Sequence, residues 1–196
     1  LDVVAAGNEG GKEYQGGLAN NYDKLTGNGV SKNNLVVANA SNPLINPNGS
    51  GELLSISIHY SSSQGPADDG RVKPDISGDG VNLYSSSSAS DASYSSKTGT
   101  SMAAPNVAGT LLLLQQYYNE LNGNFMKAST LKGLACHTAD DASPTGPDAV
   151  YGWGLLNAKA AAETILENHH LYCYPRISEG EVKTNFNNHP KIHRIE

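Results

Sequence analysis

The sequence has little charge and no long hydrophobic run. Only 16% of its 196 residues are charged, and 38% are hydrophobic. The longest apolar run lies near residues 111–114, far short of a membrane-spanning helix. The net charge of −6 argues against nucleic acid or an anionic membrane surface as a partner, because both attract clustered Lys and Arg. A disordered chain would normally carry more charge, so the abundant Gly and Ser indicate a folded domain with many tight turns.

Cysteine is scarce as well. Cys136 and Cys173 are the only two, so the chain forms one disulfide at most or carries two free thiols. Both alternatives leave the redox compartment open. The sequence begins at Leu1 with no signal peptide, and we therefore expect the start of a longer protein to be missing. The length is sufficient for one domain with a hydrophobic core.

The hydrophobic pattern predicts several short strands. Continuous apolar runs at residues 3–6 and 35–38 are typical of parallel strands that are buried on both faces. Residues 54–58 alternate between apolar and polar side chains, which predicts a strand with one apolar face. A further short strand is expected at residues 81–84.

A helix that begins close to Ser101 is predicted to be central to the domain. Apolar residues recur there at helical spacing, and the middle of the helix is apolar almost all round. Pro105 is tolerated in a first turn, which places the start of the helix near Ser101. Two more helices are expected at residues 127–136 and 157–167, the second with Asn157 as its N-cap.

Residues 98–109 read Thr-Gly-Thr-Ser-Met-Ala-Ala-Pro-Asn-Val-Ala-Gly and place a small, exposed hydroxyl at the start of this helix. A serine hydroxyl is a poor nucleophile unless a base removes its proton as it attacks. A helix N-terminus offers N–H groups and partial positive charge where an oxyanion develops. A lone serine here would more often be a simple N-cap. The whole string instead makes Ser101 a candidate nucleophile.

Residues 3–10 read Val-Val-Ala-Ala-Gly-Asn-Glu-Gly and place a side-chain amide at the end of a buried strand. An asparagine held beside a strand end can donate a hydrogen bond to a tetrahedral oxyanion. Taken alone, Asn8 would more often be a turn residue. Together with Ser101 it indicates an acyl-transfer hydrolase.

Both motifs resemble those of the subtilisin-like serine peptidases (subtilases, peptidase S8 family). Residues 62–66, Ser-Ser-Gln-Gly-Pro, and 71–76, Arg-Val-Lys-Pro-Asp-Ile, are similar to further subtilase segments. Residues 151–158, Tyr-Gly-Trp-Gly-Leu-Leu-Asn-Ala, resemble the turn and helix that close the catalytic domain. The match runs from Leu1 to about residue 167. It implies an α/β class, a parallel-sheet subtilisin-like fold with helices on both faces and its N-terminal part missing.

The resemblance also implies a serine endopeptidase that hydrolyses peptide bonds through an acyl-enzyme. Ser101 is then the nucleophile and Asn8 the oxyanion donor. Substrate-binding roles are carried over to Ala5, Ala6, Gly7 and Thr100. The implied substrates are polypeptides, and the implied location is secreted or cell-surface. No cofactor and no metal ligand set is predicted.

The chain departs from the family because it lacks two of the family's catalytic residues. Subtilases place a catalytic Asp and His before the oxyanion Asn, and no such string occurs in this sequence. His59 precedes Ser101 but matches an ordinary strand position, so we expect a partly buried structural residue; the other histidines follow Ser101. A smaller departure is residues 77–80, Ser-Gly-Asp-Gly, where the family usually has Ala-Pro-Gly.

Several interpretations remain at this point. A missing upstream segment is expected to supply the Asp and His, and the chain alone is then expected to be inactive or nearly so. The alternatives are a non-catalytic binding or structural module, an inactive fragment, or a missing N-terminal half that arrives as a separate chain. Residues 1–168 are interpreted as the C-terminal part of a catalytic domain. Residues 169–196 are interpreted as an extension or the start of a truncated further domain.

Overall fold

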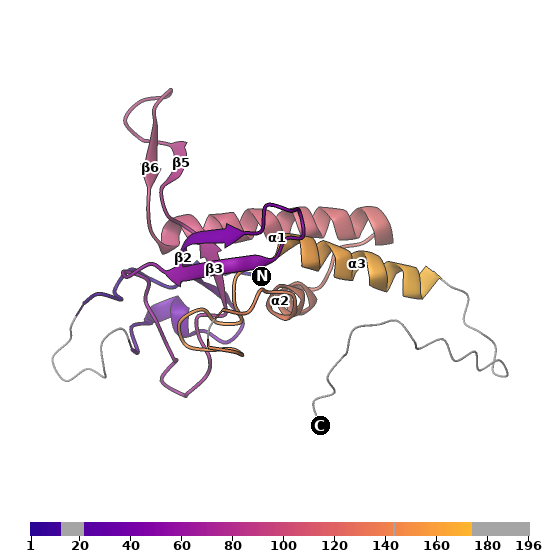
Figure 1. Ribbon diagram of the computed structural model, residues 1–196, viewed down its shortest axis with the longest axis horizontal. Helices are drawn as coiled ribbons and strands as arrows, with labels where there is room; N and C mark the ends of the chain where they lie inside the picture. The colour runs from indigo at the N-terminus through magenta and orange to yellow at the C-terminus, as the bar shows by residue number, and fades with distance from the viewer. Residues whose placement is uncertain (13–21, 143, 174–196) are drawn as a thin grey trace.

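The computed structural model describes residues 1–12, 22–142 and 144–173. Figure 1 shows a small sheet beside α-helices, with a β-hairpin that projects from the body. No helix within the described residues is long and apolar enough to cross a bilayer. The elements follow one another as β1 (Val3–Ala5), the 3₁₀ helix η1 (Gly27–Val30), β2 (Leu35–Ile45), β3 (Leu53–Ile58), β4 (Ile76–Asp79), β5 (Leu83–Ser86), β6 (Tyr94–Lys97), α1 (Thr100–Asn122), α2 (Ala128–His137) and α3 (Ala158–Cys173).

Strand β2 is the centre of the four-stranded sheet. Val37 of β2 pairs in parallel with Ala5 of β1 and with Ile76 of β4, so β1 and β4 lie on opposite edges of β2. Strand β3 is antiparallel to the second half of β2. The outer edge of β4 is paired in turn, because the Ser77 N–H donates to the Gly154 carbonyl. No described strand pairs with the outer edge of β1.

The two strands that were predicted to be buried on both faces differ from each other in how deeply they are buried. The first six residues of β2 are buried, as predicted. Strand β1 is only half-buried, so the prediction of burial on both faces is wrong for it. The physical reason is that no described segment covers the open edge of β1. Strand β2 also continues to Ile45, well beyond the predicted end at residue 38, because β3 pairs with its second half.

The other two predicted strands are present, one of them in a different place. Strand β3 confirms the predicted strand and its apolar face at Ile56 and Ile58, which are half-buried, but Leu54 of the same predicted face is 50% exposed. The strand predicted at residues 81–84 begins later, at Leu83, because Asn82 adopts a left-handed φ of 57° that ends extended structure before it. Strand β5 pairs with β6 in a separate antiparallel hairpin.

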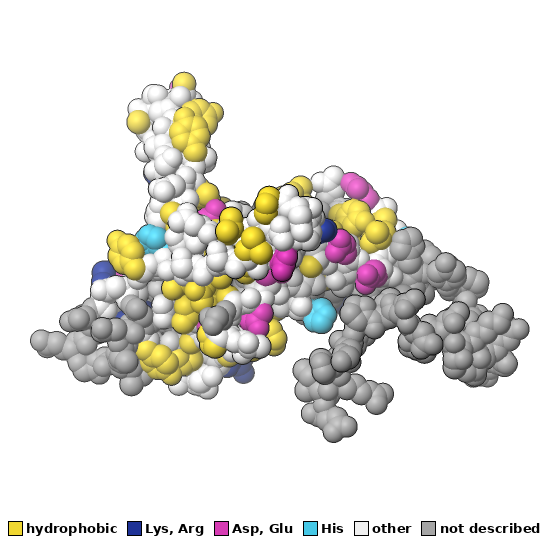
Figure 2. Space-filling model, viewed as in Figure 1, with side chains coloured by type: hydrophobic (Ala, Val, Ile, Leu, Met, Phe, Trp, Pro, Cys, Tyr) yellow, Lys and Arg dark blue, Asp and Glu magenta, His cyan; other side chains and the backbone are white. Residues whose placement is uncertain are grey.

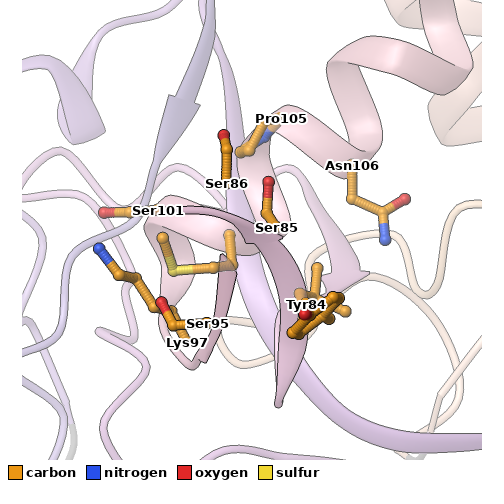
Figure 3. Close-up of a pocket in the computed structure, with 10 residues that line it drawn as sticks. Tyr84, Ser85, Ser86, Ser95, Lys97, Ser101, Pro105 and Asn106 are labelled. Carbon is orange, nitrogen blue, oxygen red and sulfur yellow. The ribbon is translucent and has the colours of Figure 1, made fainter. Parts of the chain in front are cut away.

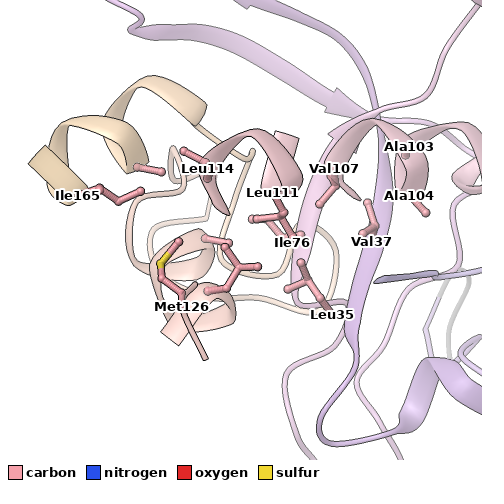
Figure 4. Close-up of a cluster of buried hydrophobic side chains, with 13 residues drawn as sticks. Leu35, Val37, Ile76, Ala103, Ala104, Val107, Leu111, Leu114, Met126 and Ile165 are labelled. Atoms are coloured by element: carbon pink, nitrogen blue, oxygen red, sulfur yellow. The ribbon is translucent and has the colours of Figure 1, made fainter. Parts of the chain in front are cut away.

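The sheet has a hydrophobic core on each face. On one face, Leu35, Val37 and Ile76 pack against α1, and α2 and α3 complete the cluster (Figure 4). On the other face, Val36 packs with Ala6 and Leu25 beside η1. The α-helices therefore cover one face and the 3₁₀ helix covers the other. The result is a mixed α/β fold with a sheet that contains parallel strands.

Helix α1 begins at Thr100, close to the predicted start near Ser101. Pro105 lies in the second turn rather than the first, so the helix forgoes one hydrogen bond to the Ser101 carbonyl. The middle of the helix was predicted to be apolar almost all round and therefore central, but Leu112 and Leu113 are 72% and 67% exposed. The described elements cover only the side of α1 that faces the sheet and α3.

The C-terminal helices follow the prediction closely at their starts. Helix α2 begins one residue later than predicted, and the Asn157 side-chain oxygen accepts the Ala160 N–H as the N-cap of α3. Helix α3 continues to Cys173, past its predicted end at residue 167. Cys136 carries a free thiol whose pKa burial raises to about 11. The predicted boundary at residue 168 stays a prediction, and residues 174–196 lie outside the described residues.

A buried carboxylate ties the sheet to α2. One oxygen of Asp75 accepts the Val36 N–H at 2.7 Å and the Lys73 ammonium at 2.5 Å. The other oxygen lies 2.9 Å from the Lys132 ammonium of α2. The Lys73 side chain is only 2% exposed, and burial lowers its pKa because loss of water disfavours the charged form. Asp75 opposes that effect and so holds two cations and one strand N–H together.

Replacement of Asp75 with Ala should therefore destabilise the domain severely. The change leaves the Lys73 ammonium buried without its counter-ion, and breaking a buried pair in this way costs about 3–5 kcal/mol. Urea titration of the full-length protein gives the free energy of unfolding and so measures this loss of stability. Asp91→Ala, at an exposed residue before β6, is the control and should shift that free energy by less than about 0.5 kcal/mol. Equal shifts for the two variants would contradict a structural role for the pair.

Candidate active site

The Ser101 side chain is exposed at the N-terminus of α1, as the sequence predicted. Ser101 is the second residue of the helix, so helical geometry leaves its N–H without an intrahelical acceptor. The Gly99 carbonyl accepts the next two N–H groups, those of Met102 and Ala103. The neighbouring Thr100 is fully buried. The chain thus turns a hydroxyl outward at the positive end of a 23-residue helix.

Asn8 and Thr100 are joined by hydrogen bonds, although they are distant in sequence. The Asn8 Oδ1 accepts the Thr100 N–H and the Thr100 hydroxyl, both at 3.1 Å. The Thr100 Oγ1 in turn accepts the Gly7 N–H at 3.2 Å. A backbone N–H can only donate, so the atom that faces it must be the amide oxygen. The Asn8 NH₂ group is therefore the end of the amide that does not bond to Thr100, and Asn8 is exposed.

Glycines allow this close approach. Gly99 has a φ of +154°, and a Cβ there would lie 3.4 Å from the Asn8 Oδ1. A Cβ on Gly80 would lie 2.8 Å from the Ala103 nitrogen, and one on Gly78 would lie 2.6 Å from a Val107 methyl. Glycine at these positions lets the start of α1 rest directly on β4. The departure from the usual family sequence at residues 77–80 therefore falls where the packing leaves no space for a Cβ.

The structure gives each of the other candidate substrate residues a definite environment. Ala5 ends β1 and is half-buried, whereas the Ala6 side chain is 4% exposed and packs against Leu25 and Val36. Gly7 has a φ of +104°, and a Cβ there would lie 2.9 Å from a buried serine hydroxyl. Their assignment to substrate binding stays a prediction.

His59 is engaged locally. It is half-buried and follows the last residue of β3. Its Nδ1 lies 2.9 Å from the Ser61 hydroxyl, and its ring centroid lies 4.6 Å from that of Tyr60. The His59 backbone N–H donates to the Asn39 carbonyl. These contacts agree with the structural role that the sequence predicted for it.

A cavity of about 350 Å³ opens beside Ser101 (Figure 3). One wall is the first two turns of α1, including Met102 and Pro105, and the other is the β5–β6 hairpin, including Lys97. Sequence reasoning missed this cavity. The serine-rich run at residues 85–96, with Tyr84 before it and Tyr94 within it, was the available signal, but it does not reveal which way the hairpin folds over α1.

The described residues bring together a hydroxyl, a fixed amide donor and a helix N-terminus. That set can stabilise a tetrahedral oxyanion, but a serine hydroxyl also needs a base. No group of three or more His, Cys, Asp and Glu residues that could hold a metal ion occurs in the part of the chain that the structure describes. The chemistry supported by this geometry is acyl transfer.

Comparison with known proteins places the chain among the subtilases. The subtilase family model matches residues 1–154. Bacillopeptidase F of Bacillus subtilis (strain 168) is 36% identical over 107 residues, which are 54% of this chain and 7% of that protein. An extracellular serine protease of Serratia marcescens is 37% identical over 68 residues, which are 35% of this chain and 6% of that protein. The chain spans less than a tenth of the length of either relative.

Solved structures share the fold. The CspB protease of Clostridium perfringens superposes with a TM-score of 0.58 at 22% identity, over 74% of this chain and 29% of that one. The prenylagaramide maturation protease PagA superposes with a TM-score of 0.59 at 19% identity, over 83% of this chain and 50% of that one. At these identities the likeness concerns the fold alone, and it agrees with the α/β architecture described above.

The hydrogen bonds of Thr100 predict how the Asn8 side chain responds to substitution. Thr100→Val keeps the volume and the backbone N–H but removes the hydroxyl that donates to the Asn8 Oδ1. The Asn8 amide should then become more mobile, which side-chain ¹⁵N relaxation of the full-length protein measures as a lower order parameter. Thr100→Ser retains the hydroxyl and should preserve the order. Unchanged relaxation in the valine variant would show that the backbone N–H alone holds Asn8.

Proposed function

The chain belongs to the subtilase family, and we propose that it forms the C-terminal part of the catalytic domain of a serine endopeptidase. Ser101 is the nucleophile and Asn8 donates to the oxyanion. The observation that carries this proposal is the fixed orientation of Asn8. Its amide oxygen is held by Thr100, the residue that immediately precedes Ser101, so the NH₂ group has a defined direction at the start of α1.

The reaction follows from these two groups and a base. The Ser101 Oγ bonds to the carbonyl carbon of the scissile peptide while the base takes its proton. The carbonyl oxygen becomes an oxyanion, to which the Asn8 NH₂ and the helix N-terminus donate. The C–N bond then breaks, the amine leaves with the proton, and an ester to Ser101 remains. Water hydrolyses the ester and regenerates the hydroxyl.

The base and its orienting carboxylate come from a segment upstream of Leu1. Two features support a further segment on that side of the molecule. Strand β1 has an open outer edge in the described residues, and parallel sheets normally occur with paired strands and covered faces. The exposed Leu112 lines a cavity of about 280 Å³ together with Leu1 and Val3. An added strand with its own side chains would cover both features.

The remaining parts of the proposal concern substrate and location. Polypeptides are the substrates of this protein, and Ala5, Ala6 and Gly7 line the site for the residue before the scissile bond. The Serratia marcescens relative is named an extracellular serine protease, and we assign a secreted or cell-surface location to this protein on that basis.

Replacement of Ser101 with Ala should abolish proteolysis by the full-length protein. The variant lacks the only atom that forms the acyl-enzyme, so cleavage of an unfolded protein substrate should fall by at least about 10³-fold. A fluorophosphonate probe should label Ser101 in the unchanged protein, and mass spectrometry of tryptic peptides identifies the labelled residue. Ser88→Ala, in the exposed part of the hairpin, is the matched control and should keep both the proteolysis and the labelling by the probe. Persistent cleavage by the Ser101 variant would overturn the proposal.

Asn8→Ala should slow the chemical step without weakening substrate binding. Loss of one oxyanion donor costs about 10²–10³-fold in kcat, a magnitude measured in a member of this family. The Michaelis constant should change little, because the donor acts on the charge that develops in the transition state. Steady-state kinetics with a peptide substrate separate the two parameters. A rise in KM with unchanged kcat would instead assign Asn8 to ground-state binding.

A further inference from the structure

The cavity beside Ser101 has two regular walls. In the hairpin register Leu83 pairs with Lys97, and Ser85 pairs with Ser95. Directly paired residues of an antiparallel ladder share one face, so these four side chains form one face of the hairpin. All four line the cavity, and Tyr84 and Ser86 from the other face of β5 line it as well. The opposite wall is formed by Ser101, Met102, Pro105 and Asn106, which follow one another at helical spacing on α1.

Lys97 is the only residue among those lining this cavity that carries a formal charge at neutral pH. The other lining residues are hydrophobic, hydroxyl or amide in character. In the part of the chain that the structure describes, Lys97 makes no ion pair, in contrast to Lys73 and Lys132, which share Asp75. The cavity therefore presents an available ammonium group within a protein whose net charge is −6.

Figure 3 shows the Lys97 ammonium and the Ser101 hydroxyl extending in the same direction. Both residues line the cavity, which lies on the hairpin side of Ser101. The β1 side is occupied by Gly7 and Asn8, which bond to Thr100. The proposed function places the residue before the scissile bond against Ala5, Ala6 and Gly7, so the residues that follow the bond would lie toward this cavity.

We propose that Lys97 makes this cavity selective for peptides that carry Asp or Glu within the first two positions after the scissile bond. The proposal rests on the proposed endopeptidase function and adds a charge preference to it. The ammonium attracts an acidic side chain and repels a basic one, and the walls exclude part of the surrounding water. A cavity of about 350 Å³ is large enough for one such side chain with its backbone.

The test is a comparison of matched peptides with the full-length protein. The peptides share one sequence and differ only in Glu, Gln or Lys at the first or second position after the cleaved bond. The ratio of kcat/KM for the Glu peptide to that for the Lys peptide should be at least about fivefold. Lys97→Gln should reduce this ratio to about one, and Lys97→Glu should invert it.

Two controls separate the possible failures. Lys127→Gln removes an exposed charge outside the cavity and should leave the ratio unchanged. The uncharged Gln peptide should be cleaved at similar rates by all variants, which shows that Lys97 acts on charge and not on folding. Cleavage with the same ratio in every variant, or an acidic preference before the scissile bond, would overturn the role of Lys97. Absence of any cleavage would overturn the proposed function and this inference with it.

Discussion

The site depends on how closely the start of α1 approaches the sheet. Gly78 on β4, Gly80 directly after it and Gly99 before the helix leave no room for a side chain between the two elements. Val107 fills the next turn against the sheet. Because this contact involves backbone atoms, the position of the helix N-terminus is fixed by packing. Ser101 therefore gains a defined place although its own side chain is exposed and makes none of those contacts.

Thr100 links the packed helix start to the Asn8 side chain. It is fully buried, and its N–H and hydroxyl both bond to the Asn8 side chain, while its Oγ1 also accepts the Gly7 N–H. The strand end and the helix start are thus one hydrogen-bonded unit. A surface asparagine amide would otherwise rotate freely, and a mobile donor stabilises an oxyanion less than a preorganised one. The hydrogen bonds from the buried threonine therefore orient the exposed asparagine.

Local patterns in the sequence predicted much of this arrangement and could not predict the rest. The apolar runs and the N-cap at Asn157 identified strands and helices, because burial and capping leave direct traces in residue types. The burial of Lys73 had no such trace, since lysine is almost always exposed, and only the partner carboxylate of Asp75 makes it tolerable. The half-burial of β1 was missed for a related reason. Two-sided burial depends on which segments cover a strand, and its own sequence does not contain that information.

The hairpin shows why the cavity beside Ser101 escaped prediction and why it suits a selective role. Beyond its base the hairpin projects from the body and carries hydrophobic side chains on its surface (Figure 2). The exposed Tyr84 and Tyr94 rings stack with their centroids 5.6 Å apart. Side chains there are held by the hairpin itself, so the core constrains them little. Residues such as Gly99 and Thr100 have no comparable freedom. A change of charge at Lys97, an exposed residue at the base of the hairpin, would leave the proposed oxyanion donor Asn8 in place, because the Asn8 side chain is held by Thr100. The proposed selectivity and the proposed catalysis therefore depend on separate contacts near the same helix start.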